Sequence, residues 1–565
     1  MFITEVVSKG KGGKTYTSIL LRQSVRVGSK VKSKTLAVLT HLPAHVVEAV
    51  RLALAQPGAT NSGLDKLAEA SAGALRLRQG PSLGALWVVD QVARRLGIKQ
   101  ALGNGHQASL GYWQVLARLL SRLRGGSTSL LGMVRLASDC AAAAILGWRK
   151  GFTEDDLYAN GAWLEQRHGL IERRLWEICK PQGQLFLYDV TSSYFEGQCN
   201  ALADWGYSRD GRSGKKQVVV GLLTDSQGEP VSVQVYRGNT SDLKTFTQQV
   251  HKIERQLGCV GVTLVGDRGM IRSEQKEAAV AAGFHFITAL SKPQIEKLLA
   301  QGVLQLELFQ ERVCDVVGPE GRRFVLRRNP IRAAELQRTR QQKHQRLEAA
   351  VRKANAYLRQ HKRARVDTQY RQLAEQMQTL GVDDWLRLSA RGRQLVLSVD
   401  TGALEAASQL DGCYVVETDL EPAQADAQTI HDRYKDLALV ERDFRMLKTG
   451  HLELRPWFVC TEENTQAHAL TAMLALKVRR RLEQAWRSLD VTVQEGLRQL
   501  EQLCVMELLD SASGHVLARQ VPEPNGCQKQ LLEALGLSLP GTVPEAKVVV
   551  VTRKKISQKR KPLAK

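Results

Sequence analysis

The chain has 565 residues, of which 43% are hydrophobic, and its 80 Lys and Arg against 57 Asp and Glu give a formal net charge of +23. This length predicts three or four domains rather than one compact core. No apolar run reaches the ~20 residues that span a bilayer, which argues against a membrane protein. The nine cysteines include no Cys-x-x-Cys pair, which argues against a disulfide framework or a zinc ribbon. We expect a cytoplasmic, nucleoid-associated protein whose partner is a polyanion, most simply nucleic acid.

The first part of the chain predicts a basic, strand-rich region followed by helices. Residues 1–35 hold eight Lys or Arg and one acid, Glu5, and short β-branched runs predict strands over a region 1–58. Apolar residues at three- and four-residue steps then predict a helical domain over 59–180 that binds DNA ends. The expected strands are 2–7, 16–21 and 35–39, and the expected helices are 64–77, 83–96, 113–123 and 164–179.

From residue 181 the pattern changes to strands. The order strand–strand–strand–helix–strand–helix–strand over 181–292 predicts the first half of an RNase H-like α/β core whose sheet is covered by helices. The expected strands are 184–190, 217–223, 230–236, 261–265 and 285–290, and the expected helices are 243–257 and 274–282.

A mixed strand and helix insertion is expected over 293–420. It contains strands within 303–328, a long charged helix or helical hairpin over 331–380, and strands at 395–398 and 413–417. The strand at 413–417 should pair with that at 285–290, so that everything between them leaves the sheet and returns. Residues 331–378 carry twelve basic and four acidic residues, which suits contact with a phosphate backbone.

The second half of the core is expected over 421–510, with helices at 424–447 and 467–486, followed by a basic tail over 511–565. The predicted fold class is therefore α/β: an RNase H-like core, interrupted by the insertion and preceded by the strand-rich and helical regions.

Three acidic residues are candidates for chemistry because of where they lie. Asp189 ends the apolar run 185–188, and Asp267 follows the apolar run 261–266. Glu441 lies within the predicted helix 424–447. Each acid alone is weak evidence for a metal site, because an Asp at a strand end is more often a turn or helix-cap residue than a metal ligand.

Tyr434, Glu441 and Lys448 are spaced seven residues apart in that predicted helix. Seven residues are almost two full turns, so the three side chains share one face. Burying unpaired charge is costly, so a helix face with these three side chains is poorly suited to packing into a core. The same face would suit contact with metal and phosphate. A solvated charged face remains the alternative.

These residues and their neighbours resemble the DDE transposases of bacterial insertion sequences, in the branch of family four and its relatives. The branch is marked by Tyr-x2-Arg-x3-Glu-x6-Lys, here Tyr434, Leu437, Glu441 and Lys448. The resemblance covers about 184–480. It includes Tyr-Asp-Val-Thr-Ser-Ser-Tyr-Phe-Glu-Gly at 188–197, Gly-Asn-Thr-Ser-Asp at 238–242, Gly-Asp-Arg-Gly-Met at 266–270 and Arg-Pro-Trp-Phe at 455–458, trailed by His468.

The resemblance implies that Asp189, Asp267 and Glu441 hold two Mg²⁺ ions, with Mn²⁺ as a substitute; oxygen ligands suit both metals. Tyr434 and Lys448 would hold phosphates near the cleavage point. Leu437 departs from the signature arginine, and Arg445, four residues after Glu441, lies on the same face and could take that role. Arg268 could contact the DNA backbone, with a helix cap or a core salt bridge as an equal alternative.

The implied function is transposition: cleavage at the ends of an insertion sequence and joining of the 3′-hydroxyls to target DNA. The expected partners are terminal inverted repeats, target DNA and a second copy of the chain. No Gly-x-x-x-x-Gly-Lys-[Ser/Thr] sequence is present, so no ATP is expected. A DNA-binding protein without catalysis and an RNase H-like nuclease are the alternatives. Residues 1–180 should recognise the ends, and Trp385 of the insertion should stack on a base or, more simply, fill a core.

Overall fold

The computed structural model divides the chain into two compact units. The flanking unit comprises Met1–Val92, Leu120–Glu154 and Arg481–Lys565, and the core unit comprises Ala93–Leu119 and Asp155–Arg480. The structure describes residues 2–9, 15–27, 30–42, 44–55, 75–121, 123, 129–179, 184–197, 199–448, 452–454, 457–511, 513–546 and 548–550. Most of the helix expected at 64–77 and the end of the basic tail, 551–565, lie outside these residues.

The flanking unit contains two small antiparallel sheets. The first has the order β1-β2-β3, and the second has the order β16-β15-β4. The strands are β1 (Phe2–Lys9), β2 (Thr15–Val27), β3 (Lys30–Val38), β4 (Leu75–Ser82), β15 (Cys504–Asp510) and β16 (Val516–Gln520). The three N-terminal strands confirm the sequence prediction, whereas β4 shows that the helix expected at 64–77 is wrong over its last three residues.

Helices of both units follow the predicted pattern before residue 180. α3 (Gly84–Arg95), α5 (His106–Leu120), α8 (Glu154–Gln166) and α9 (His168–Cys179) account for the expected helices from 83 onward. The others before residue 180 are α1 (Ala44–Ala55), α4 (Ile98–Leu102), α6 (Leu130–Asp139) and α7 (Ala142–Ile145). Among the described helices, none is both long and apolar enough to cross a membrane.

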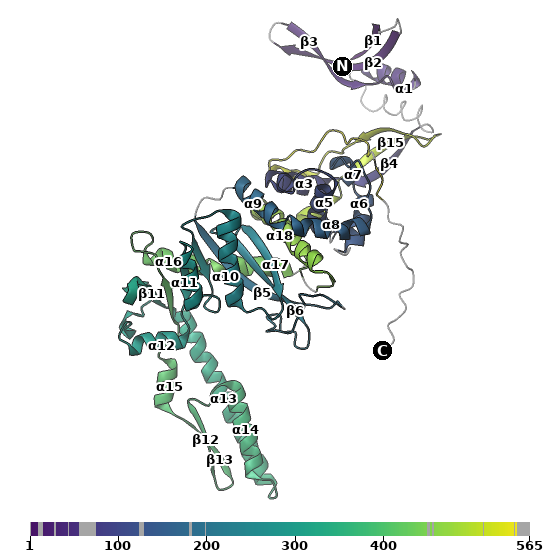
Figure 1. Cartoon of the computed structure of the whole chain (residues 1–565). Helices are drawn as coiled ribbons and strands as arrows, with labels where there is room; N and C mark the ends of the chain where they lie inside the picture. The colour runs from purple at the N-terminus through teal and green to yellow at the C-terminus, as the bar shows by residue number, and fades with distance from the viewer. Residues whose placement is uncertain are drawn as a thin grey trace. The chain divides into compact units, whose positions relative to one another are not determined.

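The core unit is built on a mixed eight-stranded sheet with the order β10-β11-β14-β9-β8-β5-β6-β7 (Figure 1). β5 pairs in parallel with β8, and β8 with β9, whereas the other neighbours are antiparallel. The strands are β5 (Leu185–Tyr194), β6 (Gln217–Asp225), β7 (Pro230–Arg237), β8 (Thr263–Gly266), β9 (His285–Ala289), β10 (Cys314–Val317), β11 (Arg323–Arg328) and β14 (Cys413–Thr418). All strands expected over 181–292 are confirmed.

Continuous apolar runs explain why the centre of this sheet is covered on both faces. β6 is buried at every residue but its last, as expected for a Val- and Leu-rich strand between layers of helix. Part of that cover comes from α10 (Asp242–Lys252), which continues as a π-helical turn to Leu257, and from α11 (Ser273–Ala281). The resulting core includes Phe186, Tyr188, Phe246, Leu264 and Phe284.

β7 ends the sheet, and side chains from two helices occupy its open edge. Glu172 of α9 accepts a hydrogen bond from the Val233 backbone N–H at 3.0 Å, and Gln466 accepts one from Val235 at 3.1 Å. Glu172 is fully buried and forms an ion pair of 2.7 Å with Lys252. These contacts satisfy backbone groups that an exposed edge would offer to another strand.

The insertion differs from its prediction in one respect. β14 pairs with β9, as expected, through Val416 and Ala289. However, β10 and β11 extend the same sheet beyond β14. The expectation that everything between 290 and 413 leaves the sheet is therefore wrong, because these two short strands complete the hydrogen bonds of an otherwise open β14 edge.

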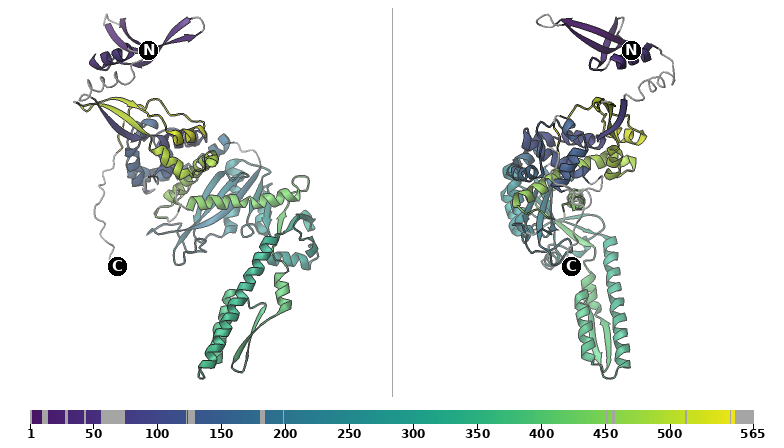
Figure 2. Two further views of the ribbon diagram at one scale, coloured as in Figure 1. Left: turned by 180° about the vertical axis from the view of Figure 1, so that it is seen from behind. Right: turned by 90° about the vertical axis from the view of Figure 1, so that its right-hand side faces the viewer.

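The rest of the insertion forms an arm that extends away from the sheet (Figures 1 and 2). The predicted charged helix is a helical hairpin, α13 (Pro330–Gln360) and α14 (Val366–Leu380). It packs against the hairpin β12 (Leu386–Arg391) and β13 (Gln394–Val399), and α15 (Thr401–Ser408) leads back to the sheet; α12 (Lys292–Ala300) precedes the arm. Trp385 is 5% exposed and packs in the arm's apolar cluster, so it is a core residue.

After the insertion, the single helix expected at 424–447 is two helices. α16 (Ala427–Lys435) and α17 (Leu437–Lys448) are separated by a turn at Asp436. Tyr434 therefore lies on one helix and Glu441 and Lys448 on the next. α18 (Glu462–Trp486) follows, and residues after it form α19 (Val493–Glu501) and α20 (Gly526–Glu533). Neither α20 nor β16 was predicted for the tail.

Candidate active site

Asp189 and Asp267 come from neighbouring parallel strands at the same edge of the sheet. Leu187 of β5 pairs with Val265 of β8, and Tyr188 pairs with Gly266. Asp189 and Asp267 each follow the last of these pairs, so their backbones lie side by side. Asp189 is half-buried within β5, and Asp267 is exposed just after β8.

Glu441 reaches this edge from α17, which packs against β5 and β6. Val440, Phe444 and Leu447 form the buried stripe of α17, and Glu441 lies exposed outside that stripe. Burial raises the pKa of the Asp189 carboxyl to about 7. The hydrogen bond from Val190 opposes this rise, whereas the charges of Asp267 and Glu441 add to it. The three acids, here named the acid cluster, therefore share one electrostatic environment.

The donor chemistry of the acid cluster suits a hard divalent cation, because every donor is a carboxylate oxygen. No described residue forms an ion pair with any of the three acids. Asp189 Oδ1 accepts from the Val190 N–H, and Asp267 Oδ1 accepts from the Arg268 N–H, both at 2.8 Å. As these side chains lie, no three His, Cys, Asp or Glu side chains of the described residues converge closely enough to hold a metal ion.

Tyr434 and Lys448 both contact the acid-bearing strands. The Tyr434 hydroxyl donates to Asp267 Oδ1 at 3.2 Å. Burial, followed by the charge of Asp267, raises the pKa of Tyr434, so it remains a hydrogen-bond donor. Lys448 Nζ donates to Thr191 Oγ1 of β5 at 2.5 Å and to Asp210 Oδ1 at 2.8 Å.

Sequence reasoning missed Asp210 and Arg209, which lie in the polar loop between β5 and β6. The ion pair of Asp210 with Lys448 is buried, with side chains 3% and 10% exposed. Arg209 pairs with Asp242 at 2.6 Å, and its charge opposes part of the rise in the pKa of Asp189. The only sequence signal was the position of this loop directly after β5, because Asp210 and Lys448 are 238 positions apart.

The remaining candidates lie at the exposed side of the cluster. Arg268 is exposed beside Asp267, and its charge lowers the pKa of Tyr434. Arg445 is exposed one helical turn after Glu441 and so shares its side of α17. Leu437 is half-buried as the first residue of α17. Of the Arg-Pro-Trp-Phe segment, Arg455 and Pro456 lie outside the described residues, whereas Trp457 is fully buried against His468.

Solved structures with low similarity to the chain include two transposase complexes. One is the piggyBac transposase synaptic complex with hairpin DNA, at 7% identity and a TM-score of 0.34, covering 74% of this chain and 77% of that chain. The other is the Mos1 transposase paired-end complex with left transposon end, at 10% identity and a TM-score of 0.14, covering 32% of this chain and 59% of that chain. No curated protein matches the chain.

Family models give the decisive matches. The model described as "Transposase DDE domain" matches residues 163–477, which is 315 of the 565 residues, and "IS1634 family transposase, N-terminal domain" matches residues 3–62. The signature of Tyr434, Glu441 and Lys448 resembles that of insertion-sequence family four, whereas the N-terminal match is to the IS1634 family. Both are families of insertion-sequence transposases. Domains of the matched family generally use divalent metal ions. The chain belongs to the DDE transposases and is a DNA-cleaving transposase of an insertion sequence.

Proposed function

We propose that this transposase cuts the ends of its element and joins the freed 3′-hydroxyls to target DNA at the acid cluster. The observation that carries the proposal is the placement of Asp189 on β5 and Asp267 just after β8 at one edge of the sheet, with Glu441 on α17, which packs against β5. Burial and then the charges of Asp267 and Glu441 raise the pKa of Asp189. Among the described residues none forms an ion pair with these carboxylates, and an external cation would favour the charged form of each of them.

The catalytic sheet supports an RNase H-like core. Its five central strands have the order β9-β8-β5-β6-β7, in which β5, β6 and β7 are antiparallel and β8 and β9 run parallel to β5. This is the topology that the strand and helix order of 181–292 predicted. We extend the assignment to the second half of the core over 421–510, with the insertion over 293–420.

Asp189, Asp267 and Glu441 would hold two Mg²⁺ ions, with Mn²⁺ as a substitute, because carboxylate oxygens suit both metals. When bound, such ions supply activation of the attacking oxygen and stabilisation of the leaving oxygen. Tyr434, Lys448, Arg268 and Arg445 would contact phosphates. Lys448 acts as a compact point charge whose height is fixed by Thr191 and Asp210.

The reaction then needs two displacements at phosphorus. In the first, a water oxygen bonds to phosphorus and the P–O3′ bond breaks, which leaves a 3′-hydroxyl on the element's end. In the second, that 3′-oxygen bonds to a target phosphorus and the target's own P–O3′ bond breaks. The second step exchanges one phosphodiester for another, so it requires no ATP and no covalent enzyme intermediate.

Recognition and assembly are assigned by position in the chain. Residues 1–58 and 59–180 would read the terminal inverted repeats, and the arm of the insertion would close over flanking DNA. α13 and α14 carry most of the twelve basic residues of 331–378. Two ends must be cut together, so we propose a homodimer with one acid cluster for each end. Residues 511–565 would add a basic tail.

The test uses the purified chain with supercoiled donor DNA that carries the element's ends, a separate target and Mg²⁺. We expect cleavage at the ends only with divalent metal, 3′-hydroxyl products, and joined donor–target molecules. Cleavage without joining would indicate a nuclease. Binding without metal-dependent cleavage would indicate a DNA-binding protein that has lost catalysis.

A further inference from the structure

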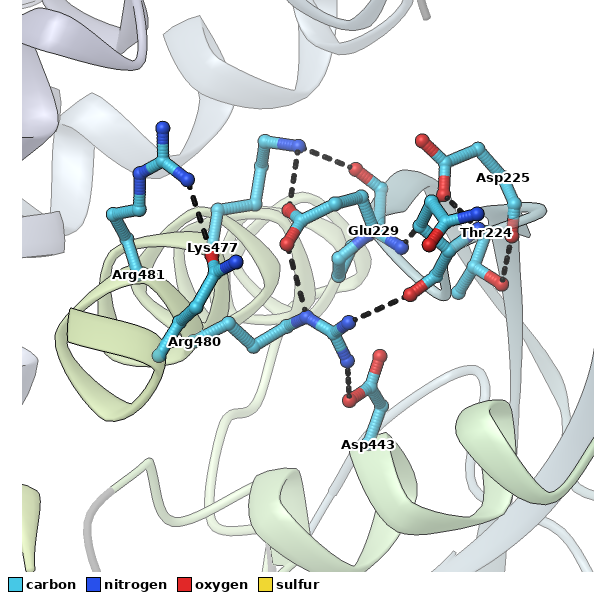
Figure 3. A network of polar contacts seen from close by, with 10 residues as sticks. Thr224, Asp225, Glu229, Asp443, Lys477, Arg480 and Arg481 are labelled. Atoms are coloured by element: carbon cyan, nitrogen blue, oxygen red, sulfur yellow. Dashed lines mark hydrogen bonds and ion pairs between the residues drawn. The ribbon is translucent and has the colours of Figure 1, made fainter. Parts of the chain in front are cut away.

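A second group of charged residues lies behind α17, within the core unit and away from the acid cluster. Figure 3 shows the Arg480 guanidinium of α18 between the carboxylates of Glu229 and Asp443. Arg480 Nη1 donates to Asp443 Oδ1 at 2.6 Å, and Nε donates to Glu229 Oε1 at 3.1 Å. Lys477, one helical turn earlier on α18, contacts the other Glu229 oxygen at 3.5 Å and donates to the Pro230 carbonyl at 2.9 Å. We name these four residues the buried network; Glu229, whose side chain is 36% exposed, lies at its edge.

The buried network joins α17 to the turn between β6 and β7. That turn is fixed by Asp225, which accepts from the Gln227 and Glu229 N–H groups, each at 2.9 Å. Arg480 Nη2 also donates to the Gln227 carbonyl at 3.0 Å. Gly228 has a φ of +74°, and a Cβ there would lie 2.8 Å from Leu439 Cβ. The turn therefore touches α17 directly at Leu439 and, through Arg480, at Asp443.

These two points bracket Glu441. Leu439 and Asp443 are four residues apart and lie on one face of α17, whereas Glu441 is two residues from each. Each helical residue rotates by about 100°, so Glu441 points to the opposite face, toward the acid cluster. Holding residues 439 and 443 against the sheet therefore sets both the rotation of α17 and the height of Glu441.

Lys448, the last residue of α17, is anchored by Thr191 and Asp210, whereas the buried residues between Leu439 and Lys448 are apolar except for Asp443. Val440, Phe444 and Leu447 are apolar, and apolar contacts are non-directional. Asp443 is fully buried within this stripe, its Oδ1 is held by Arg480, and its Oδ2 has no hydrogen-bond partner among the described residues. In coiled coils, a buried polar residue in an apolar seam can fix the register of packed helices.

We propose that Asp443 and Arg480 are positioning residues that set the place of the Glu441 carboxylate in the acid cluster. They lie outside the acid cluster, and they act through α17. A slip by one residue would move Glu441 by about 1.5 Å and rotate it by about 100°, which would remove it from the metal. The proposal rests on the proposed function, because it assigns Glu441 as a metal ligand.

The main test replaces the charged pair by apolar residues of similar volume in the double variant Asp443→Leu, Arg480→Met. Such replacements are often neutral for stability, so thermal unfolding should stay close to that of the wild type. We expect Mn²⁺ affinity, measured by electron paramagnetic resonance of free Mn²⁺, to fall at least about tenfold. kcat for cleavage should fall about 100-fold with KM for end DNA unchanged.

The matched control is the double variant Lys276→Met, Glu417→Leu. It removes another buried ion pair of the core unit, whose atoms are 2.6 Å apart and whose carboxylate is also shared with an arginine, Arg322. The control should keep Mn²⁺ affinity and kcat. A folded Asp443→Leu, Arg480→Met variant with wild-type Mn²⁺ affinity and kcat would overturn the proposal.

Two further variants keep the outcome decisive. If the Asp443→Leu, Arg480→Met variant does not fold, Arg480→Lys is tested in its place. Lysine keeps the charge but cannot reach both carboxylates. Wild-type Mn²⁺ affinity and kcat in a folded Arg480→Lys variant would overturn the proposal. Glu441→Gln tests the proposed function itself. If Glu441→Gln keeps Mn²⁺ affinity and cleavage, the assignment of the acid cluster fails. If only Glu441→Gln loses them, the positioning role alone fails.

Discussion

The two faces of α17 carry carboxylates in opposite situations. On one face, Glu441 joins Asp189 and Asp267 in the acid cluster, where no described residue forms an ion pair with them. On the other face, Asp443 is paired with Arg480 in the buried network. Burial raises the pKa of Asp443 to about 6, but the charge of Arg480 opposes the rise.

Under the proposed function, the difference separates a structural group of charges from a functional one. The buried network supplies its own cations, so its net charge is settled when the chain folds. In the proposed function, a bound cation balances the charge of the acid cluster, so the cluster costs stability without a cation and provides binding free energy for one. Neutralising a carboxylate should therefore have opposite effects in the two groups, and four predictions test this contrast.

The largest effect is expected from removing one member of the acid cluster. Asp189→Ala, Asp267→Ala and Glu441→Ala should each reduce metal-dependent cleavage by at least about 10⁴-fold, because a catalytic metal is emptied or displaced. End binding should survive, since it rests on phosphate contacts elsewhere. Cleavage of supercoiled donor DNA and gel-shift binding measure the two properties. A variant that cuts at a near wild-type rate would remove that residue from the cluster.

Glu172, a buried carboxylate at the edge of the sheet that is paired with Lys252, should affect stability but not activity. Burial would raise the pKa of Glu172, but the charges of Lys252 and His168 outweigh it and lower the pKa to about 2. Because the folded-state pKa lies below the ordinary value of 4.5, the stabilisation is complete above pH 4.5 and is lost as the pH falls toward 2.

Glu172→Gln should therefore destabilise the protein by roughly 3 kcal/mol at neutral pH, since Lys252 is left without its counter-ion. The difference from the wild type should shrink as the pH is lowered from 4.5 toward 2. Urea unfolding and hydrogen exchange at the Val233 amide measure it. Cleavage per folded molecule should not change. A loss of kcat without a loss of stability would contradict the structural role.

Lys448 has features of both groups. It forms an ion pair with Asp210, and in the proposed function it also lies beside the cleavage site. Lys448→Met should lower kcat by roughly 100-fold, as expected when one preorganised charge at a transition state is removed. Asp210→Asn is the matched control, since the amide oxygen still accepts from Lys448 Nζ, so its loss should stay below about tenfold. Equal losses in both variants would mean that Lys448 serves only to hold the loop.

The sequence predicted those parts of the site that depend on local pattern. Apolar runs that end in Asp189 and Asp267 predicted two strands, and their pairing at one sheet edge followed from the fold class. The turn at Asp436 was not predicted. The apolar residues of α16 and α17 keep helical spacing across this single non-helical residue, so the sequence pattern predicts one helix. The pairs of Lys448 with Asp210 and of Asp443 with Arg480 join distant segments, which no local pattern encodes. Asp443 did leave a signal: it is a charged residue at a stripe position among Val440, Phe444 and Leu447.

The smallest effect should be the sharpest test of the contrast. A divalent cation that binds only the folded chain stabilises it by about 1.4 kcal/mol at ten times its Kd, so Mn²⁺ should raise the Tm of the wild type. Asp189→Asn should raise the Tm without metal, since it removes a buried charge beside Asp267 and Glu441, and it should abolish the response to Mn²⁺. Asp443→Ala should instead lower the Tm without metal, because Arg480 loses a buried partner. If Asp189→Asn lowers the metal-free Tm as Asp443→Ala does, the acid cluster is compensated from within, and the distinction between the two faces of α17 fails.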